Sequence, residues 1–108
     1  MDSTTTALNV LFNRIPRRHS LENVKDINSI VNEYEDLLIR IEAVNSYYEK
    51  NMPAFFDELD MVRSIIKKST DNKASKKSKD NFFDEGSGAL KESIQALISL
   101  YDEGNKTA

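Results

Sequence analysis

The 108-residue sequence contains no cysteine and no tryptophan, and it has only three glycines, two prolines and one histidine. Without cysteine the chain has no disulfide framework, no thiolate zinc site and no thiol nucleophile, and it suits a reducing compartment. So few glycines and prolines do not provide the regularly spaced turns of a β-sandwich or β-barrel. Helices are therefore the expected secondary structure.

Long apolar stretches are also missing, since no uninterrupted apolar run exceeds three residues. A membrane-spanning helix needs about 20 mostly apolar residues, so we expect no membrane span. The five residues after Met1 are polar and include an aspartate, unlike the basic start and apolar run of a secretory leader. We expect an intracellular protein, cytoplasmic or nuclear.

Apolar residues at helical spacing are what the chain does have. Ser20 can cap a helix, and the apolar residues that follow it recur at steps of three and four. These residues form a heptad stripe: Val24, Ile27, Val31, Tyr34, Leu38, Ile41 and, after the polar Asn45, Tyr48. A neighbouring column of Ile30, Leu37 and Val44 widens the stripe to the face of a bundle core. We predict one long helix over residues 20–50, ending before Pro53 because proline disfavours helical geometry in the residue before it.

Two further helices are predicted, over residues 53–68 and 87–103. Both carry apolar residues at helical spacing, and the first has acidic residues early and basic residues late, as the helix dipole favours. Ser87 is the expected cap of the C-terminal helix.

The remaining segments are an N-terminal arm, residues 1–19, with a short helix near residues 7–13, and a lysine-rich flexible loop, residues 69–81. The loop prediction depends on the near absence of apolar residues from that segment. The expected fold is thus an all-α helical bundle, with residues 1–108 forming one domain.

Residues able to carry catalysis are scarce. His19 is the only histidine, it follows Arg17 and Arg18, and we interpret it as a solvent-exposed loop residue. One histidine and no cysteine exclude a His or Cys metal cluster, and no glycine-rich phosphate loop follows a predicted strand. We expect no enzyme activity, no bound metal and no cofactor.

Charge is distributed unevenly along the chain. Residues 20–60 hold ten acidic and three basic residues, whereas residues 61–79 hold seven basic residues and one acidic residue. Lys76, Lys77 and Lys79 resemble a short basic import signal and are candidates for binding nucleic acid or acidic lipid. A solvated loop is the favoured interpretation, and nucleic acid is an improbable partner, because lysine alone provides no base stacking.

The segment from Arg17 to Leu21 has the pattern that arginine-directed kinases accept. Arg17 and Arg18 precede Ser20 by three and two positions, and the apolar Leu21 follows it. Ser20 is therefore a candidate phosphorylation site as well as the expected helix cap, and the unmodified cap is the favoured interpretation. A phosphate there would be stabilised by the helix dipole.

The long stripe predicts protein–protein contact, since the two shorter helices can lie side by side and leave part of it uncovered. We expect a small subunit or adaptor that binds one or more helical partners, including a second copy of itself. The candidate partner-binding residues are Val24, Ile27, Val31, Tyr34, Leu38, Ile39, Ile41, Tyr47 and Tyr48. A self-contained monomer is the structural alternative. A helical inhibitor that presents its acidic surface to a basic partner is a functional alternative, as is the basic-loop binder.

Overall fold

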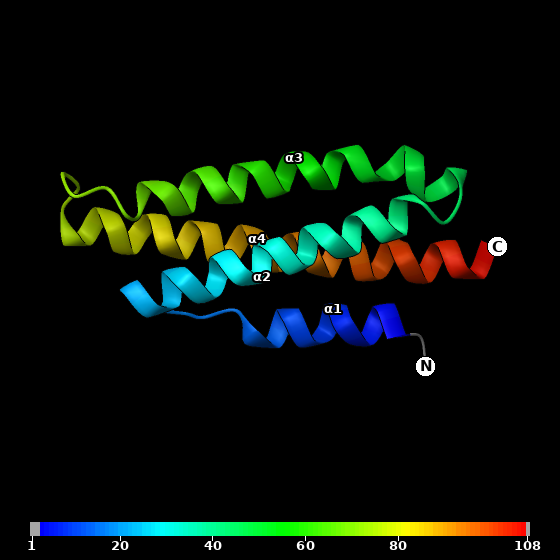
Figure 1. Cartoon of the computed structure of the whole chain (residues 1–108), viewed down its shortest axis with the longest axis horizontal. Coiled ribbons are helices and arrows are strands. Elements are labelled where there is room, and N and C mark those ends of the chain that lie inside the picture. The colour runs from blue at the N-terminus through cyan, green and yellow to red at the C-terminus, as the bar shows by residue number, and fades with distance from the viewer. Residues whose placement is uncertain (1–2, 108) are drawn as a thin grey trace.

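The computed structural model describes residues 3–107, with side chains described for residues 3–103, and contains four α-helices. They are α1 (Ser3–Arg14), α2 (Leu21–Glu42), α3 (Ser46–Lys68) and α4 (Lys76–Thr107), and no strand occurs among the described residues. The helices alternate in direction along one axis, and α1 lies at the edge of the bundle in contact with both α2 and α4 (Figure 1). The predicted all-α bundle is confirmed. Its longest helix is α4, rather than the predicted helix 20–50.

The predicted single helix over residues 20–50 is wrong, because the chain reverses direction at residues 43–45. Asn45 has extended backbone angles, and its side-chain oxygen accepts a hydrogen bond from the N–H of Tyr48 at 3.1 Å. It therefore caps α3 instead of occupying a core position of a longer helix. The reversal allows Tyr48 to pack on Tyr101 of α4, with stacked rings 5.4 Å apart.

The predicted helix boundary at Pro53 is also wrong, since Pro53 lies inside α3, seven residues after its start. Proline costs a helix interior one backbone hydrogen bond and crowds the carbonyl four residues earlier. Pro53 faces solvent. Burial of seven side chains along α3, from Tyr48 to Ile66, offsets that local cost.

At the other end of the molecule, the predicted loop 69–81 is only seven residues long, residues 69–75. Asp71 accepts a hydrogen bond from the N–H of Lys73, and Ser75 caps α4 by accepting one from the N–H of Ser78. The C-terminal helix therefore begins at Lys76 rather than at residue 87, and Ser87 is buried in its interior instead of capping it. The N-terminal helix also extends beyond the predicted residues 7–13.

One hydrophobic core runs through the bundle and receives side chains from all four helices. Its largest fully buried members include Tyr34, Tyr48 and Phe83. The hydroxyl of Tyr34 on α2 lies 2.8 Å from that of Ser93 on α4, and the hydroxyl of Tyr48 donates to the carbonyl of Tyr101 at 3.0 Å. Within the described residues, no buried side-chain nitrogen or oxygen lacks a hydrogen-bond partner. The chain thus covers its own apolar stripe.

Candidate functional site

The residues predicted to bind a partner fall into two groups. Seven lie in the chain's own core, where at most 7% of each residue's surface is exposed to solvent. They are Val24, Ile27, Val31, Tyr34, Leu38, Ile41 and Tyr48. Ile39 and Tyr47 remain on the surface, exposed by 52% and 37%. A partner that meets the folded chain therefore reaches only these two members of the predicted set.

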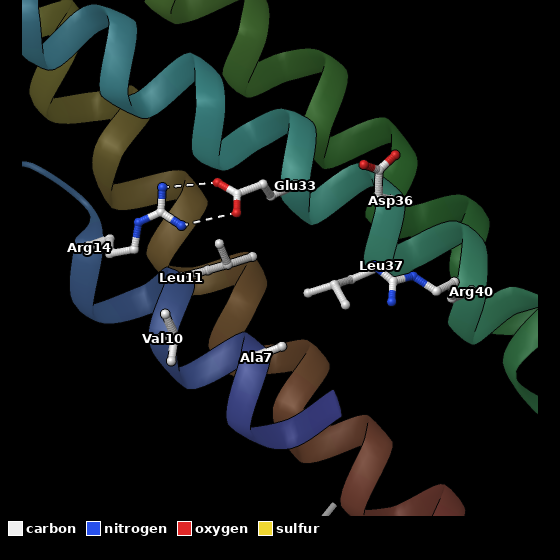
Figure 2. A pocket seen from close by; sticks show the side chains of 8 residues that line it. All are labelled: Ala7, Val10, Leu11, Arg14, Glu33, Asp36, Leu37 and Arg40. Atoms are coloured by element: carbon white, nitrogen blue, oxygen red, sulfur yellow. Dashed lines mark hydrogen bonds and ion pairs between the residues drawn. The ribbon is translucent and has the colours of Figure 1, made fainter. Parts of the chain in front are cut away.

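A groove with a volume of about 240 Å³ lies between α1 and α2. Ala7, Val10 and Leu11 line it from α1, and Leu37 reaches toward them from α2 (Figure 2). Val10 is 50% exposed, whereas Leu11 and Leu37 are buried and belong to the core. The groove thus has an apolar floor that is continuous with the core.

A second hollow, of about 140 Å³, continues the groove toward the α2–α3 connection. The two hollows share Leu37 and Arg40, and the second adds Ile41, Val44 and Tyr101 to the apolar lining. Val44 is 60% exposed. Together they form a furrow, the α1–α2 groove, that follows α1 along its length.

Charged side chains border the α1–α2 groove. The Arg14 guanidinium bridges the two helices through two contacts with the Glu33 carboxylate, at 2.9 and 3.1 Å (Figure 2). The hydrogen bond that Arg14 donates to the Glu33 carboxylate raises the pKa of Arg14 above its ordinary value. Arg40, farther along α2, forms no ion pair or hydrogen bond with any described side chain. One cation of the groove is therefore paired, and the other is available.

The groove was not among the surfaces predicted from the sequence. Ala7, Val10, Leu11 and Arg14 have the i, i+3, i+4, i+7 spacing of one helix face, which was the available signal. The prediction assigned the exposed apolar surface to the long stripe instead, because it did not include the reversal at residues 43–45. The reversal allows α3 to pack against the stripe, α4 reaches it where Ser93 meets Tyr34, and the open edge lies beside α1.

A basic surface lies at the end of the bundle that holds the α3–α4 connection. Lys73, Lys76 and Lys77 are exposed there, and Lys79 is half-buried in the first turn of α4. Lys76 shares a shallow hollow with Arg17 and Arg18, so the fold brings together two basic segments that are far apart in sequence. Asp80 and Asp84 line the same hollow and reduce its net positive charge.

His19 is not the solvent-exposed loop residue that was expected, because only 16% of its side chain is exposed. Its ring packs edge-on against Phe83 of α4, with ring centres 5.7 Å apart, and its Nδ1 lies 3.7 Å from a carboxylate oxygen of Asp80. The histidine thus attaches the α1–α2 connection to α4. Among the described residues, no three histidine, aspartate or glutamate side chains gather as metal ligands would.

The fold and surface define an all-α four-helix bundle with a short first helix and an apolar groove beside it. No protein-family model, no curated protein and no solved structure matches the chain. No helix in the described part of the chain has the length and apolar composition needed to cross a bilayer.

Proposed function

We propose that the protein is a non-enzymatic interaction module that binds an amphipathic helix of a partner protein in the α1–α2 groove. The observation that carries this proposal is the groove in which the exposed Val10, and Val44 farther along, lie beside Leu11 and Leu37 of the core. Folded chains usually bury such surface, and apolar grooves are a recurrent docking site for helices.

The size of the groove favours a helix as its occupant. Because α1 has 12 residues, it is about 18 Å long, which matches about three turns of a second helix laid alongside it. A partner helix would place apolar residues at i, i+3 or i+4, and i+7 over Val10, Leu37 and Val44. The complex would then add a fifth helix to the bundle.

Charge at the groove specifies one further property of the partner. Arg14 already binds Glu33, whereas Arg40 has no described partner. A carboxylate on the incoming helix would pair with the Arg40 guanidinium, in the bidentate geometry that Arg–carboxylate pairs favour. The proposed ligand is therefore an amphipathic helix with an acidic residue beside its apolar face.

Two substitutions of matched exposure test the proposal. Val10 in the groove is 50% exposed and Ile39 outside it is 52% exposed, so replacing each by glutamate adds the same charge at sites of equal accessibility. Affinity capture with the wild-type chain would supply candidate partners, and titration of purified wild-type and variant chains with each partner's isolated helix would measure affinity. We expect V10E to weaken binding about tenfold or more and I39E to leave it nearly unchanged.

Charge reversal adds a second test. Arg40→Glu should weaken the same helix, and replacing the partner's acidic residue by lysine should restore binding to that variant. Equal losses from V10E and I39E would contradict the groove as the binding site. Sedimentation of the purified chain over a concentration series identifies the case in which the partner is a second copy.

The basic surface supports a second candidate function, binding to an anionic lipid surface. The supporting observation is that Arg17 and Arg18 adjoin Lys76 in one hollow, beside the exposed Lys73 and Lys77. Clusters of four or more basic residues attract acidic leaflets. Co-sedimentation with phosphatidylserine vesicles and with phosphatidylcholine vesicles, at low and at physiological salt, tests it. Equal recovery on both vesicle types would exclude this function.

A further inference from the structure

The connection between α1 and α2, residues 15–20, presents a serine in a form that a protein kinase can recognise. Arg17 and Arg18 are exposed, and Leu21, directly after the serine, is 80% exposed. Ser20 itself has extended backbone angles, φ −159° and ψ 161°. We propose that Ser20 is phosphorylated by an arginine-directed serine/threonine kinase.

The arrangement of side chains supports Ser20 rather than another serine. Kinases select substrates largely by charge pattern, and carboxylates of the enzyme bind arginine in bidentate geometry. Both arginines and the apolar residue after the serine are accessible, while His19 between them packs on Phe83. The two arginines are thus exposed on the connection before α2, and Leu21 is exposed at the first position of that helix.

Ser78 provides the comparison within the same chain, because it too follows two basic residues, Lys76 and Lys77. It lies inside the first turn of α4, where its N–H donates to the hydroxyl of Ser75. Lysine cannot replace arginine in bidentate recognition, and a helical backbone does not fit an extended substrate cleft. Ser78 is therefore the serine expected to stay unmodified.

Access to the Ser20 hydroxyl requires a local opening that leaves the core intact. Its Oγ accepts a hydrogen bond from the N–H of Asn23 at 3.0 Å, and the Asn23 side chain donates to the carbonyl of Arg18 at 2.8 Å. Releasing these bonds unwinds the first turn of α2, and the first buried side chain of that helix is Val24. Such terminal openings require far less free energy than global unfolding.

The transfer itself needs only the kinase and its ATP. The Ser20 Oγ attacks the γ-phosphorus, the bond from that phosphorus to the bridging oxygen of ADP breaks, and ADP leaves with the bond electrons. The hydroxyl proton passes to the catalytic carboxylate of the kinase. The product is a phosphoserine that carries nearly two negative charges, with its oxygens placed to accept from the free N–H groups of the first turn as the hydroxyl did.

The experiment uses the purified full chain, Mg-ATP and the catalytic subunit of cyclic-AMP-dependent kinase, with intact mass and peptide fragmentation as readouts. Ser20→Asn is the central variant, because asparagine keeps the helix cap and cannot accept phosphate. Ser29→Ala, at an exposed serine of α2 with no arginine among the four residues before it, is the matched control. A peptide of residues 14–26 measures recognition of the motif without the fold.

We expect one phosphate at Ser20, none in S20N and unchanged incorporation in S29A. The double variant R17K/R18K keeps the charge and should lower kcat/KM about tenfold or more, because lysine loses the bidentate contact. Phosphorylation of the peptide without phosphorylation of the full chain would overturn the proposal, since it would show that the fold shields Ser20. Incorporation in S20N equal to that of the wild type would overturn it as well.

Discussion

The two sides of the bundle differ in how completely the chain closes them. On one side, α3 buries seven of its side chains against its neighbours, and α4 brings Gly86 against Ile65 and Ile66. On the other side, α1 buries only Leu8 and Leu11 within its 12 residues and leaves the α1–α2 groove open. The difference shows that a helix of about three turns anchors itself without filling the space beside a helix of 22 residues.

The largest expected effect comes from the same truncation made on each side. Leu59 on α3 is 1% exposed and enclosed by the core, whereas Leu11 on α1 is 3% exposed and also lines the groove. Leu59→Ala leaves an enclosed cavity and should cost about 4 kcal/mol, while Leu11→Ala opens into the groove and should cost about 2 kcal/mol. Urea denaturation followed by circular dichroism measures both. Equal costs would show that α1 is packed as tightly as α3.

Two glycines of α4 allow a second comparison of packing on the closed side with packing elsewhere, because only one of them faces the closed side. A Cβ added at Gly86 would lie 2.5 Å from Cδ1 of Ile66, whereas one added at Gly88 would meet nothing within 4 Å. Gly86→Ala should therefore destabilise by about 1–2 kcal/mol, since overpacking exceeds the gain in helix propensity. Gly88→Ala should stabilise by about 0.5–1 kcal/mol. Thermal melts of the two variants would show shifts of opposite sign, and two shifts of the same sign would contradict this packing.

The buried hydroxyl pair across the bundle should have an intermediate effect. Tyr34→Phe leaves the Ser93 hydroxyl buried without its partner and should cost about 1–2 kcal/mol. Burial also raises the pKa of Tyr34 above its ordinary value of about 10. Neutral Tyr34 therefore contributes to the free energy of unfolding while the pH is below the pKa that this tyrosine has in the unfolded chain. That contribution is lost as the pH rises above this value. The wild type should therefore lose more stability than Y34F between pH 9 and 11, as measured by denaturation at each pH.

The sequence predicted those parts of the fold that depend on local pattern. The spacing of the stripe identified the buried face of α2, and Ser20 caps that helix through the N–H of Asn23 as expected. The α1–α2 groove could not be obtained in this way, because it depends on which helix covers which face. The prediction placed Tyr48 on the stripe of α2, whereas it reaches the core from α3.

Three of the boundary errors have specific physical causes. Asn45 was interpreted as a polar core residue because its spacing fits the heptad, but the same side chain can cap a helix. Pro53 was interpreted as the end of a helix. An exposed proline can be tolerated inside a helix when many other side chains of that helix are buried. Lys76, Lys77 and Lys79 oppose the dipole at the start of α4, and the burial of Phe83, about two turns after that start, favours helix there.

The smallest expected effects belong to the two ion pairs that join α2 to its neighbours. Arg14–Glu33 lies on the open side, with side chains 44% and 51% exposed, and Arg63–Glu35 lies on the closed side, with 33% and 39% exposed. Arg63 also donates to Asn32 at 3.0 Å.

Double-mutant cycles with glutamine should give coupling energies of about 0.2–0.5 kcal/mol for Arg14–Glu33 and up to about 1 kcal/mol for Arg63–Glu35. Both should fall in 1 M salt, where the Debye length is about 3 Å. A coupling above about 2 kcal/mol for Arg14–Glu33 would mean that the ion pair, rather than Leu8 and Leu11, is what holds α1 on the bundle.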